Sequence, residues 1–469
     1  MLYWILRGVA RIALRWYYRD IHVVGAARVP AKGAAILAAN HNNALVDALV
    51  VGSAVRRKVR LTAKATLLDH PLTRGLVAAV GIVPLRRTGD ERKGAAGRDD
   101  PRSAPMTPDD ARNADAFATI VDSLAAGGLV LIFPEGKSHS EPALAPLKTG
   151  CARIALQARD GRSLRGLPII PVGLTFERKG QPRSRVLVHV GVPIDVDAVP
   201  GNDPTAVQEL TARVDAGLRD VTLNFATPDD AARLLSISSL LADVLDEVRP
   251  LHAPDAPLSD SISIARRLEE VRRRLPHASA DTLAAVDDFL TNLDAFRERL
   301  RRLRIPVYDI TLPTSAASGL WFVIREGLIV TALLPLALWG RLNHWLPIAL
   351  ARRVALATSR NADDPAMHTL VSGLAFVIAF YVVVAAIVAV SVGWRWAAIY
   401  LLSLPPAASL DFWLSDRLER ARRRASAYFT LRRDPLLRDE LREEAQALRS
   451  QAERLDAAFR EPPIGSDVG

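Results

Sequence analysis

The sequence contains a single cysteine, Cys151, among its 469 residues. One thiol excludes a disulfide framework and a cysteine-built zinc site, and it fits a reducing compartment. Lysine is scarce as well, because only seven occur and all of them precede residue 180. The 61 basic residues are therefore mostly arginines, and against 51 acidic residues they give a net charge of +10. This balance favours an anionic partner: nucleic acid, an acidic membrane surface or a phosphorylated substrate.

Motifs that define several other classes of protein are also missing. The run GKS at 136–138 would complete a phosphate-binding P-loop only with a glycine five residues earlier, where the chain has Leu131. No G-x-S-x-G run is present, which argues against a serine hydrolase. His41 and His139 lack the paired spacing or carboxylate cluster of a metal site, so no metal is expected. Nucleic-acid binding fits the charge but lacks a fold motif, so we expect no nucleic acid as a partner.

Long apolar runs are abundant. Hydrophobic residues make up 49% of the chain and the mean hydropathy is +0.12, which excludes global disorder and is high for a soluble enzyme. Residues 366–394 carry no charged side chain and exceed the roughly 20 apolar residues that span a bilayer. Residues 327–351 form a weaker candidate, and residues 396–410 are short and contain two prolines, which indicates a re-entrant or interfacial segment. A buried core helix is the alternative for each segment.

Arginines near these segments bear on the orientation of the chain in a membrane. Residues 417–433 are dense in arginine, which the positive-inside rule places on the cytoplasmic side. Arg352 and Arg353 lie between two apolar segments and argue for the opposite orientation, so the number of crossings stays open. We expect an integral membrane protein with its catalytic domain on the cytoplasmic face.

The first 19 residues predict an amphipathic helix at a membrane interface. Arginines recur at every fourth position, and apolar side chains occupy another face of the helix. The basic positions are Arg7, Arg11, Arg15 and Arg19, and the apolar positions are Ile5, Val9, Ile12 and Trp16. Charges interrupt any apolar core of a signal peptide, so we do not expect one. Anionic membrane lipid is the expected partner of this helix, and the alternative is an ordinary surface helix.

Residues 20–200 predict an α/β domain. Apolar runs at 34–40, 129–135, 167–176 and 185–191 are typical of buried strands, and the stretches between them are helical in pattern. Such alternation favours a mostly parallel sheet flanked by helices. Beyond this domain the sequence predicts a helical region over 201–310, a membrane-embedded region over 311–410 and a basic helical tail over 411–469.

The first candidate for chemistry is the run AANHNNALVDALVVG at residues 38–52. His41 follows an apolar strand and precedes an apolar helix, a position where active-site residues often gather. Six residues advance a helix by about 600°, so His41 and Asp47 would point to different faces of one helix. They meet only if His41 lies in the turn and Asp47 reaches back from the first helical turns. A carboxylate on one imidazole nitrogen leaves the other basic toward a hydroxyl; the alternative is a structural histidine.

A second run, GIVPLRR, ends an apolar strand with Arg86 and Arg87. Two neighbouring guanidiniums form a fork that suits a phosphate. The alternative is a pair of solvated arginines at a strand end.

Two more runs place polar or constrained residues at the ends of strands, where ligands of α/β sheets bind. FPEGKSHSEP contributes Glu135, Gly136 and Ser138, and LPIIPVG contributes Pro171. Lys148, in PLKTG just before a helical run, is a further candidate for binding phosphate. A surface lysine is the alternative for this position.

In this order, the four blocks resemble the glycerolphosphate and lysophospholipid acyltransferase family. They span residues 41–173, about a third of the chain. In that family the histidine is the general base on the acceptor hydroxyl and the aspartate orients it, so the resemblance assigns these roles to His41 and Asp47. It assigns the acceptor phosphate to Arg87, with Arg86 beside it.

The resemblance also implies that Glu135, Gly136 and Pro171 shape the acceptor site of an α/β acyltransferase domain. The family pattern usually has four residues between histidine and aspartate, and this chain has five. The fungal-type glycerol-3-phosphate/dihydroxyacetone-phosphate acyltransferases are similar in this respect, at GKSHSEP and at LAPLKTGCARIALQA (144–158), and in carrying later membrane segments. The extra residue therefore points to that branch.

The resemblance implies a membrane-bound O-acyltransferase of phospholipid synthesis. It would move a fatty acyl group from acyl-CoA or acyl carrier protein to a hydroxyl of glycerol-3-phosphate or 1-acylglycerol-3-phosphate, with no bound cofactor. Backbone N–H groups after His41, or around Gly136, would stabilise the oxyanion. Two alternatives stay open: a lysophospholipid-remodelling acyltransferase, and a non-catalytic membrane scaffold or lipid-transfer protein that retains the fold.

Overall fold

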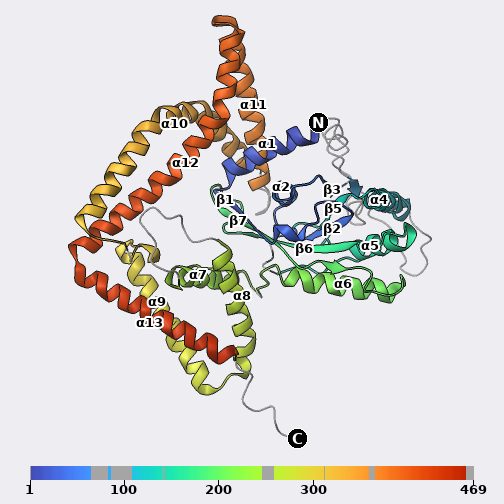
Figure 1. Cartoon of the computed structure of the whole chain (residues 1–469), viewed down its shortest axis with the longest axis horizontal. Coiled ribbons are helices and arrows are strands. Elements are labelled where there is room, and N and C mark those ends of the chain that lie inside the picture. Colours follow the sequence, from blue (N-terminus) through green and yellow to red (C-terminus); the bar gives the residue numbers. More distant parts are fainter. Residues whose placement is uncertain are drawn as a thin grey trace. The chain divides into compact units, whose positions relative to one another are not determined.

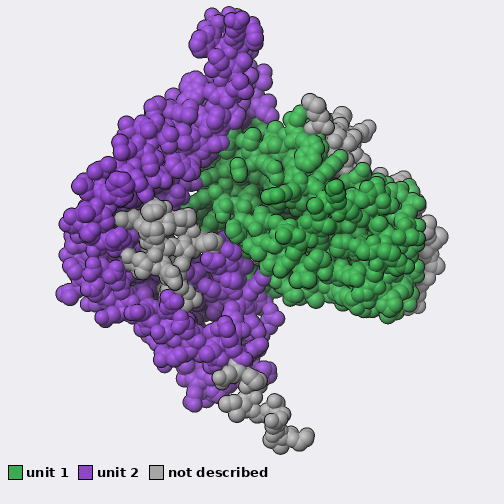
Figure 2. Space-filling view, in the orientation of Figure 1, with its two compact units in different colours: residues 1–224, 351–374 green, residues 225–350, 375–469 purple. Residues whose placement is uncertain are grey.

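A computed structural model describes residues 2–64, 83–85, 108–139, 141, 143–225, 227–245, 258–310, 312–358 and 365–460. The chain divides into two compact units, coloured separately in Figure 2. Unit 1 comprises residues 1–224 and 351–374, and unit 2 comprises residues 225–350 and 375–469.

Unit 1 is built on one sheet, which has eight strands within the described residues (Figure 1). Across the sheet the strands are β1 (Asp20–Val24), β7 (Arg185–Val190), β6 (Pro168–Phe176), β2 (Ala35–Ala39), β5 (Leu129–Ile132), β3 (Val59–Lys64) and β4 (Val83–Leu85). The short strand β8 (Ile194–Asp195) pairs with β6. Central strands such as β2 are buried at every position, as expected for a sheet that is covered on both faces.

Most neighbouring strands of this sheet run parallel. The antiparallel pairs are β6 with β7 and β6 with β8; the others, including β6–β2, β2–β5 and β5–β3, are parallel. The carboxyl ends of β2 and β5 therefore meet at one edge of the sheet, where Ala38 pairs with Ile132. The predicted fold class, a mostly parallel sheet flanked by helices, is confirmed.

Helices cover both faces of the sheet, and the side chains of each strand alternate between them. On one face Ile36, Ala38 and Val130 pack with α4 (Pro108–Ala125), α5 (Gly150–Gly161) and α6 (Pro204–Arg219). On the other face Leu37 and Leu131 pack with α1 (Leu2–Tyr17) and α2 (Leu45–Ala54). Because α6 belongs to this core, unit 1 extends to residue 224 rather than to residue 200.

Cys151 lies in the first of these two cores, on α5. Its side chain is buried, and burial raises the pKa of the thiol to about 12. The only cysteine of the chain is therefore a small core residue that carries almost no thiolate at neutral pH.

Helix α1 is amphipathic, but its arginines do not all face outward. Arg11 Nη2 donates to the main-chain oxygen of Ser53 at 2.8 Å, and Arg7 donates to that of Val55. Two positive charges thus lie at the carboxyl end of α2, where they oppose its dipole. The exposed apolar side chains of α1 form a separate group: Leu2, Trp4, Ile5 and Ile12. The surface of α1 therefore presents this apolar group together with the exposed Arg11 and Arg15, whereas Arg7 is buried.

Unit 2 is helical throughout its described residues. The helices α7 (Pro228–Leu245), α8 (Leu258–Arg274), α9 (Ala280–Leu303) and α13 (Pro435–Arg460) surround an apolar cluster that includes Phe289, Leu293 and Leu441. Ion pairs fasten α13 to its neighbours, for example Arg267–Asp456 at 2.6 Å. The helical region that the sequence predicted is therefore a packed bundle.

Among the described residues, three helices are long and apolar enough to cross a membrane. They are α10 (Ala316–Thr358), α11 (Pro365–Ser391) and α12 (Trp394–Arg433). Helix α12 continues through both prolines and reaches residue 433, so residues 396–410 do not form the separate short segment that the sequence analysis expected. Ser409 Oγ donates to the main-chain oxygen of Pro405, one turn earlier in the same helix, at 2.8 Å.

Within unit 2, polar side chains join α10 to α12 along these apolar segments. Arg417 Nε lies 2.6 Å from Glu326 Oε2, and Arg341 Nη2 lies 2.9 Å from Asp411 Oδ1. At Gly340, an added Cβ would come within 2.3 Å of the main-chain oxygen of Ala407. Close packing and paired charges are what membrane helices need when they carry ionised residues.

A substitution at Gly173 of β6 tests how closely the elements of unit 1 pack. A Cβ at this position would lie 1.9 Å from the main-chain oxygen of Val221, so we expect Gly173→Ala to lower the stability by about 1–3 kcal/mol. Gly161→Ala is the matched control, because a Cβ there meets nothing closer than 4.0 Å. Thermal unfolding of the full chain in detergent measures both, and equal melting temperatures would contradict the close approach.

Candidate active site

The candidate site lies where β2 and β5 end. Asn40, directly after β2, fixes this end of the sheet, because its amide is buried and bonded twice to β6. Asn40 Nδ2 donates to the oxygen of Leu174 at 3.1 Å, and the N–H of Leu174 donates to Asn40 Oδ1 at 2.7 Å. His41 is the next residue, so its backbone begins from a rigid position.

His41 and Asp47 meet in the geometry that the spacing required. His41 lies in the turn before α2, and Asp47 lies in the first turn of that helix. The distance from His41 Nδ1 to Asp47 Oδ2 is 2.9 Å. The same Oδ2 atom accepts from the N–H of Asn43 at 2.7 Å, which fixes the carboxylate against the start of the helix.

Asp47 is fully buried, with an exposed fraction of 0%. Burial raises the pKa of its carboxyl, whereas the hydrogen bonds from His41 and Asn43 act in the opposite direction. The buried Tyr18 contacts the neighbouring Asn43, because its hydroxyl accepts from Asn43 Nδ2 at 3.3 Å. A buried carboxylate next to an imidazole would stabilise the imidazolium that forms when His41 takes up a proton.

Glu135 joins the loop after β5 to the loop after β2. Its side chain is 2% exposed, and Oε1 accepts from the N–H of His41 at 2.6 Å. Oε2 accepts from the N–H of Ala145 at 2.9 Å and also contacts His139 Nε2. The N–H of His139 donates in turn to the oxygen of His41 at 3.1 Å. The two loops are therefore held together by one carboxylate and by the main chain of His41.

Gly136, Ser138 and Lys148 surround the same turn. Gly136 has a φ of 73°, and the side chain of Lys148 lies so close that an added Cβ would meet its Cδ at 3.0 Å. Lys148 itself is exposed. Ser138 Oγ accepts from the N–H of Ala44 at 3.0 Å, where Ala44 has an unusual φ of 47°. The strained turn before α2 is thus held by the loop that follows β5.

The imidazole of His41 is partly exposed and lies flat against a second ring. Its centroid is 4.0 Å from that of Phe133, with 17° between the planes. Within the part of the chain that the structure describes, no group is bonded to His41 Nε2. The atom that would take a proton is therefore open, while the opposite nitrogen is held by Asp47.

The expected oxyanion donors are partly engaged elsewhere. The N–H groups of Asn43, Ala44 and Gly136 donate to Asp47, to Ser138 and to the oxygen of Phe133 respectively. These three groups are not available to a reacting carbonyl without a rearrangement. An oxyanion would need other donors around the same turn.

Not every residue predicted for the site is brought to this cluster. Pro171 lies inside β6, buried, and its ring occupies the space that a side chain at Gly217 of α6 would need. Arg86 and Arg87 lie outside the described residues; the strand that precedes them, β4, ends at Leu85.

Sequence reasoning assigned no role to Asn40, Phe133 and His139. His139 was considered only as a metal ligand; residues 135–139 form a loop rather than a helix, so the spacing of four residues gave no signal of its pair with Glu135. Asn40, next to His41, gave no distinctive signal, because its partner Leu174 is 134 positions away. Phe133 carried an apolar strand pattern that does not reveal a ring stacked on the histidine.

This part of the chain is similar to known proteins. The acyltransferase family model matches residues 20–175, which contain both loops of the site. Residues 20–175 are therefore similar to the acyltransferase family, and we refer to them as the acyltransferase domain. The match covers a third of the chain and ends within β6.

Relatives of this chain occur in yeast. Glycerol-3-phosphate O-acyltransferase 2 of Saccharomyces cerevisiae is 32% identical over 164 residues, which cover 33% of this chain and 21% of that protein. Glycerol-3-phosphate O-acyltransferase 1 of the same yeast is 25% identical over 257 residues, covering 52% of this chain and 32% of that protein. The matches thus span only a fifth to a third of the length of these relatives.

A solved structure also matches. It is the 1-acyl-sn-glycerophosphate acyltransferase PlsC from Thermotoga maritima, with 18% sequence identity and a TM-score of 0.34. The match covers 46% of this chain and 79% of that one.

The substitution Asp47→Asn tests the role of the His41–Asp47 pair in acyl transfer. The amide oxygen can still accept from the N–H of Asn43, so we expect the protein to fold, but the charge that stabilises protonated His41 is lost. The kcat for acyl transfer should fall about a hundredfold or more, with little change in KM. Asp115→Asn, at an exposed position of α4, is the control. A kcat within threefold of wild type would refute the role of Asp47.

Glu135→Gln tests the junction of the two loops. The amide nitrogen cannot accept a hydrogen bond, so it leaves at least one of the N–H groups of His41 and Ala145 unpaired in a buried place. We expect a loss of stability of about 1–3 kcal/mol, together with a drop in activity. The same change at Glu141, which is exposed in the same loop, should alter neither the melting temperature nor the rate. A stable but inactive Glu135→Gln protein would instead indicate direct contact with substrate.

Proposed function

We propose that this chain is a membrane-bound O-acyltransferase that moves a fatty acyl group from an acyl thioester to a hydroxyl of glycerol-3-phosphate or 1-acylglycerol-3-phosphate. The observation that carries the proposal is the His41 imidazole, bonded at Nδ1 to the buried Asp47 and open at Nε2. The similarity of the chain to yeast enzymes named for glycerol-3-phosphate supports the class of acceptor.

The proposed reaction is a direct transfer. His41 Nε2 removes the proton of the acceptor hydroxyl as that oxygen attacks the thioester carbonyl. The carbon–sulfur bond breaks, the thiolate of coenzyme A or acyl carrier protein leaves, and the proton passes from His41 to the leaving sulfur. Asp47 stabilises the imidazolium between these two steps. The chain needs no nucleophile of its own and no bound cofactor for this sequence.

Charge around the site supports a phosphorylated acceptor. Lys148 lies over Gly136, at the loop that follows β5, and Lys179 Nζ donates to the oxygen of His139 at 3.3 Å. We assign the acceptor phosphate to Arg87, with Arg86 beside it, because these arginines directly follow the residues of β4 in the chain. Lys148 is the second candidate for that phosphate.

Membrane attachment supports an acceptor or product that carries an acyl chain. In the described part of the chain three helices are long and apolar enough to cross a bilayer, and α1 exposes Leu2, Trp4, Ile5 and Ile12. We place the exposed apolar group of α1 in the headgroup boundary and the acyltransferase domain on the cytoplasmic face. An acyl chain would then reach the site without crossing water.

The test is acyl transfer from labelled acyl-CoA, in membranes that contain the full chain. The acceptors are glycerol-3-phosphate, dihydroxyacetone phosphate, 1-acylglycerol-3-phosphate and larger lysophospholipids, and acyl carrier protein replaces coenzyme A in a second series. We expect one phosphorylated glycerol acceptor to be acylated, and His41→Ala to lower the rate by at least about a hundredfold. His277→Ala, an exposed histidine of unit 2, is the control.

Three results would contradict the proposal. Activity that survives intact in His41→Ala would exclude the histidine as the general base. No transfer with either donor, by a protein that is folded and inserted in the membrane, would favour a non-catalytic membrane protein. Acylation of a larger lysophospholipid alone would favour the remodelling enzyme over the proposed one.

A further inference from the structure

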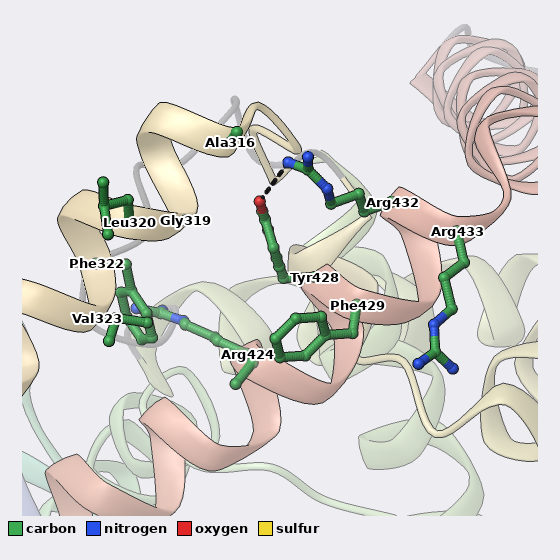
Figure 3. Close-up of a pocket in the computed structure, with 11 residues that line it drawn as sticks. Ala316, Gly319, Leu320, Phe322, Val323, Arg424, Tyr428, Phe429, Arg432 and Arg433 are labelled. Carbon is green, nitrogen blue, oxygen red and sulfur yellow. Dashed lines mark hydrogen bonds between the residues drawn. The ribbon is translucent and has the colours of Figure 1, made fainter.

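Unit 2 contains a cavity that the acyltransferase domain does not share. Its volume is about 550 Å³, and it lies between the beginning of α10 and the end of α12. Figure 3 shows Leu320, Phe322 and Val323 on α10, facing residues of the last turns of α12. Both helices are candidate membrane spans, so the cavity lies at one end of an apolar helix pair.

The walls of the cavity are apolar and largely uncovered. Leu320 and Val323 are each 63% exposed, and Phe429 is 57% exposed. Room for the cavity is left by small residues, namely Ala316, Gly319 and Ala425. Apolar side chains with this exposure at the end of a membrane span are suited to contact with a hydrocarbon chain rather than with water.

The polar part of the lining is entirely basic or neutral. Of the eleven lining residues, three are arginines and none is acidic: Arg424, Arg432 and Arg433. Arg432 and Arg433 are exposed, whereas Arg424 is 7% exposed and lies 3.6 Å from Asp309. The lining of the cavity therefore carries an excess of positive charge.

Tyr428 holds the guanidinium of Arg432 at a defined position. It is four residues from both Arg424 and Arg432, so the three side chains follow one face of α12. Its hydroxyl donates to the oxygen of Ser315 at 2.9 Å and accepts from Arg432 Nη1 at 2.8 Å (Figure 3). Arg432 Nη1 also donates to the oxygen of Thr314 at 3.1 Å. The guanidinium of Arg432 is thus held where α10 begins.

We propose that this cavity binds an anionic glycerophospholipid of the surrounding bilayer. The negatively charged head group lies against Arg432 and Arg433, and one acyl chain lies against Leu320, Val323 and Phe429. Charge complementarity and the uncovered apolar walls together select this occupant. An inorganic anion would leave the walls exposed, and a zwitterionic lipid would not balance the arginines. The proposal does not depend on the acyltransferase reaction.

The test is a lipid titration of the purified full chain in detergent, with bound lipid counted by native mass spectrometry. The probe is dioleoylphosphatidylglycerol, and the comparators are dioleoylphosphatidylcholine and sodium phosphate. We expect the anionic lipid to bind at least about tenfold more tightly than the zwitterionic lipid, in line with a charge-assisted contact. Sodium phosphate should not displace it.

Three variants locate the site. Arg432→Gln should weaken binding of dioleoylphosphatidylglycerol about tenfold. Ala425→Trp fills the cavity, keeps every arginine and should also weaken it. Arg422→Gln removes the same charge from an exposed position of α12 outside the cavity and should leave binding unchanged. Size-exclusion chromatography and circular dichroism confirm that each variant is folded.

Each remaining outcome would overturn the proposal. Equal binding of the two lipids by the wild type would mean that the arginines do not select charge. An equal loss in Arg422→Gln and Arg432→Gln would mean that the general charge of α12 attracts the lipid. Displacement by sodium phosphate would identify a site for a free anion. Full binding by folded Ala425→Trp would place the lipid outside the cavity.

Discussion

The buried carboxylate of Glu135 is the constraint on which the site depends. It receives the N–H groups of His41 and Ala145 and contacts His139, so that two loops from different strands share one acceptor group. A carboxylate that is 2% exposed is tolerated only when such donors replace the water it has lost. The position of His41 is therefore set by a residue 94 positions away as much as by its own strand.

A second buried carboxylate, that of Asp47, has a different environment. It lies at the start of α2, where the N–H of Asn43 and the helix dipole both favour a negative charge, while burial opposes it. The fold thus places two acidic groups on either side of His41. Glu135 positions the backbone of His41, whereas Asp47 holds its imidazole ring and would stabilise the positive charge on it. Positioning and charge stabilisation are thus carried by different residues.

The sequence predicted the fold and the central pair well because both follow from local pattern. Apolar runs gave the strands, and the requirement that His41 lie in the turn followed from helix geometry. The role of Glu135 as a junction depended on contacts far apart in the chain, which no local pattern encodes.

Helix lengths were less predictable. Prolines in a sequence usually indicate that a helix ends. Helix α12 nevertheless continues through its two prolines, from Trp394 to Arg433, because an apolar helix packed against another can accommodate them. The predicted domain boundary at residue 200 falls just before α6, whose apolar face packs on the sheet. The amphipathic pattern of α6 does not tell whether its apolar face packs on the sheet or on a separate bundle.

The burial of Cys151 has a practical consequence for the membrane topology. A thiol reagent attacks the thiolate at an accessible sulfur, and this side chain is 2% exposed with a pKa raised to about 12. The native chain should therefore react very little with maleimides at neutral pH. A cysteine introduced at either end of α10, α11 or α12 would report, without background from the rest of the protein, which side of the bilayer that end faces.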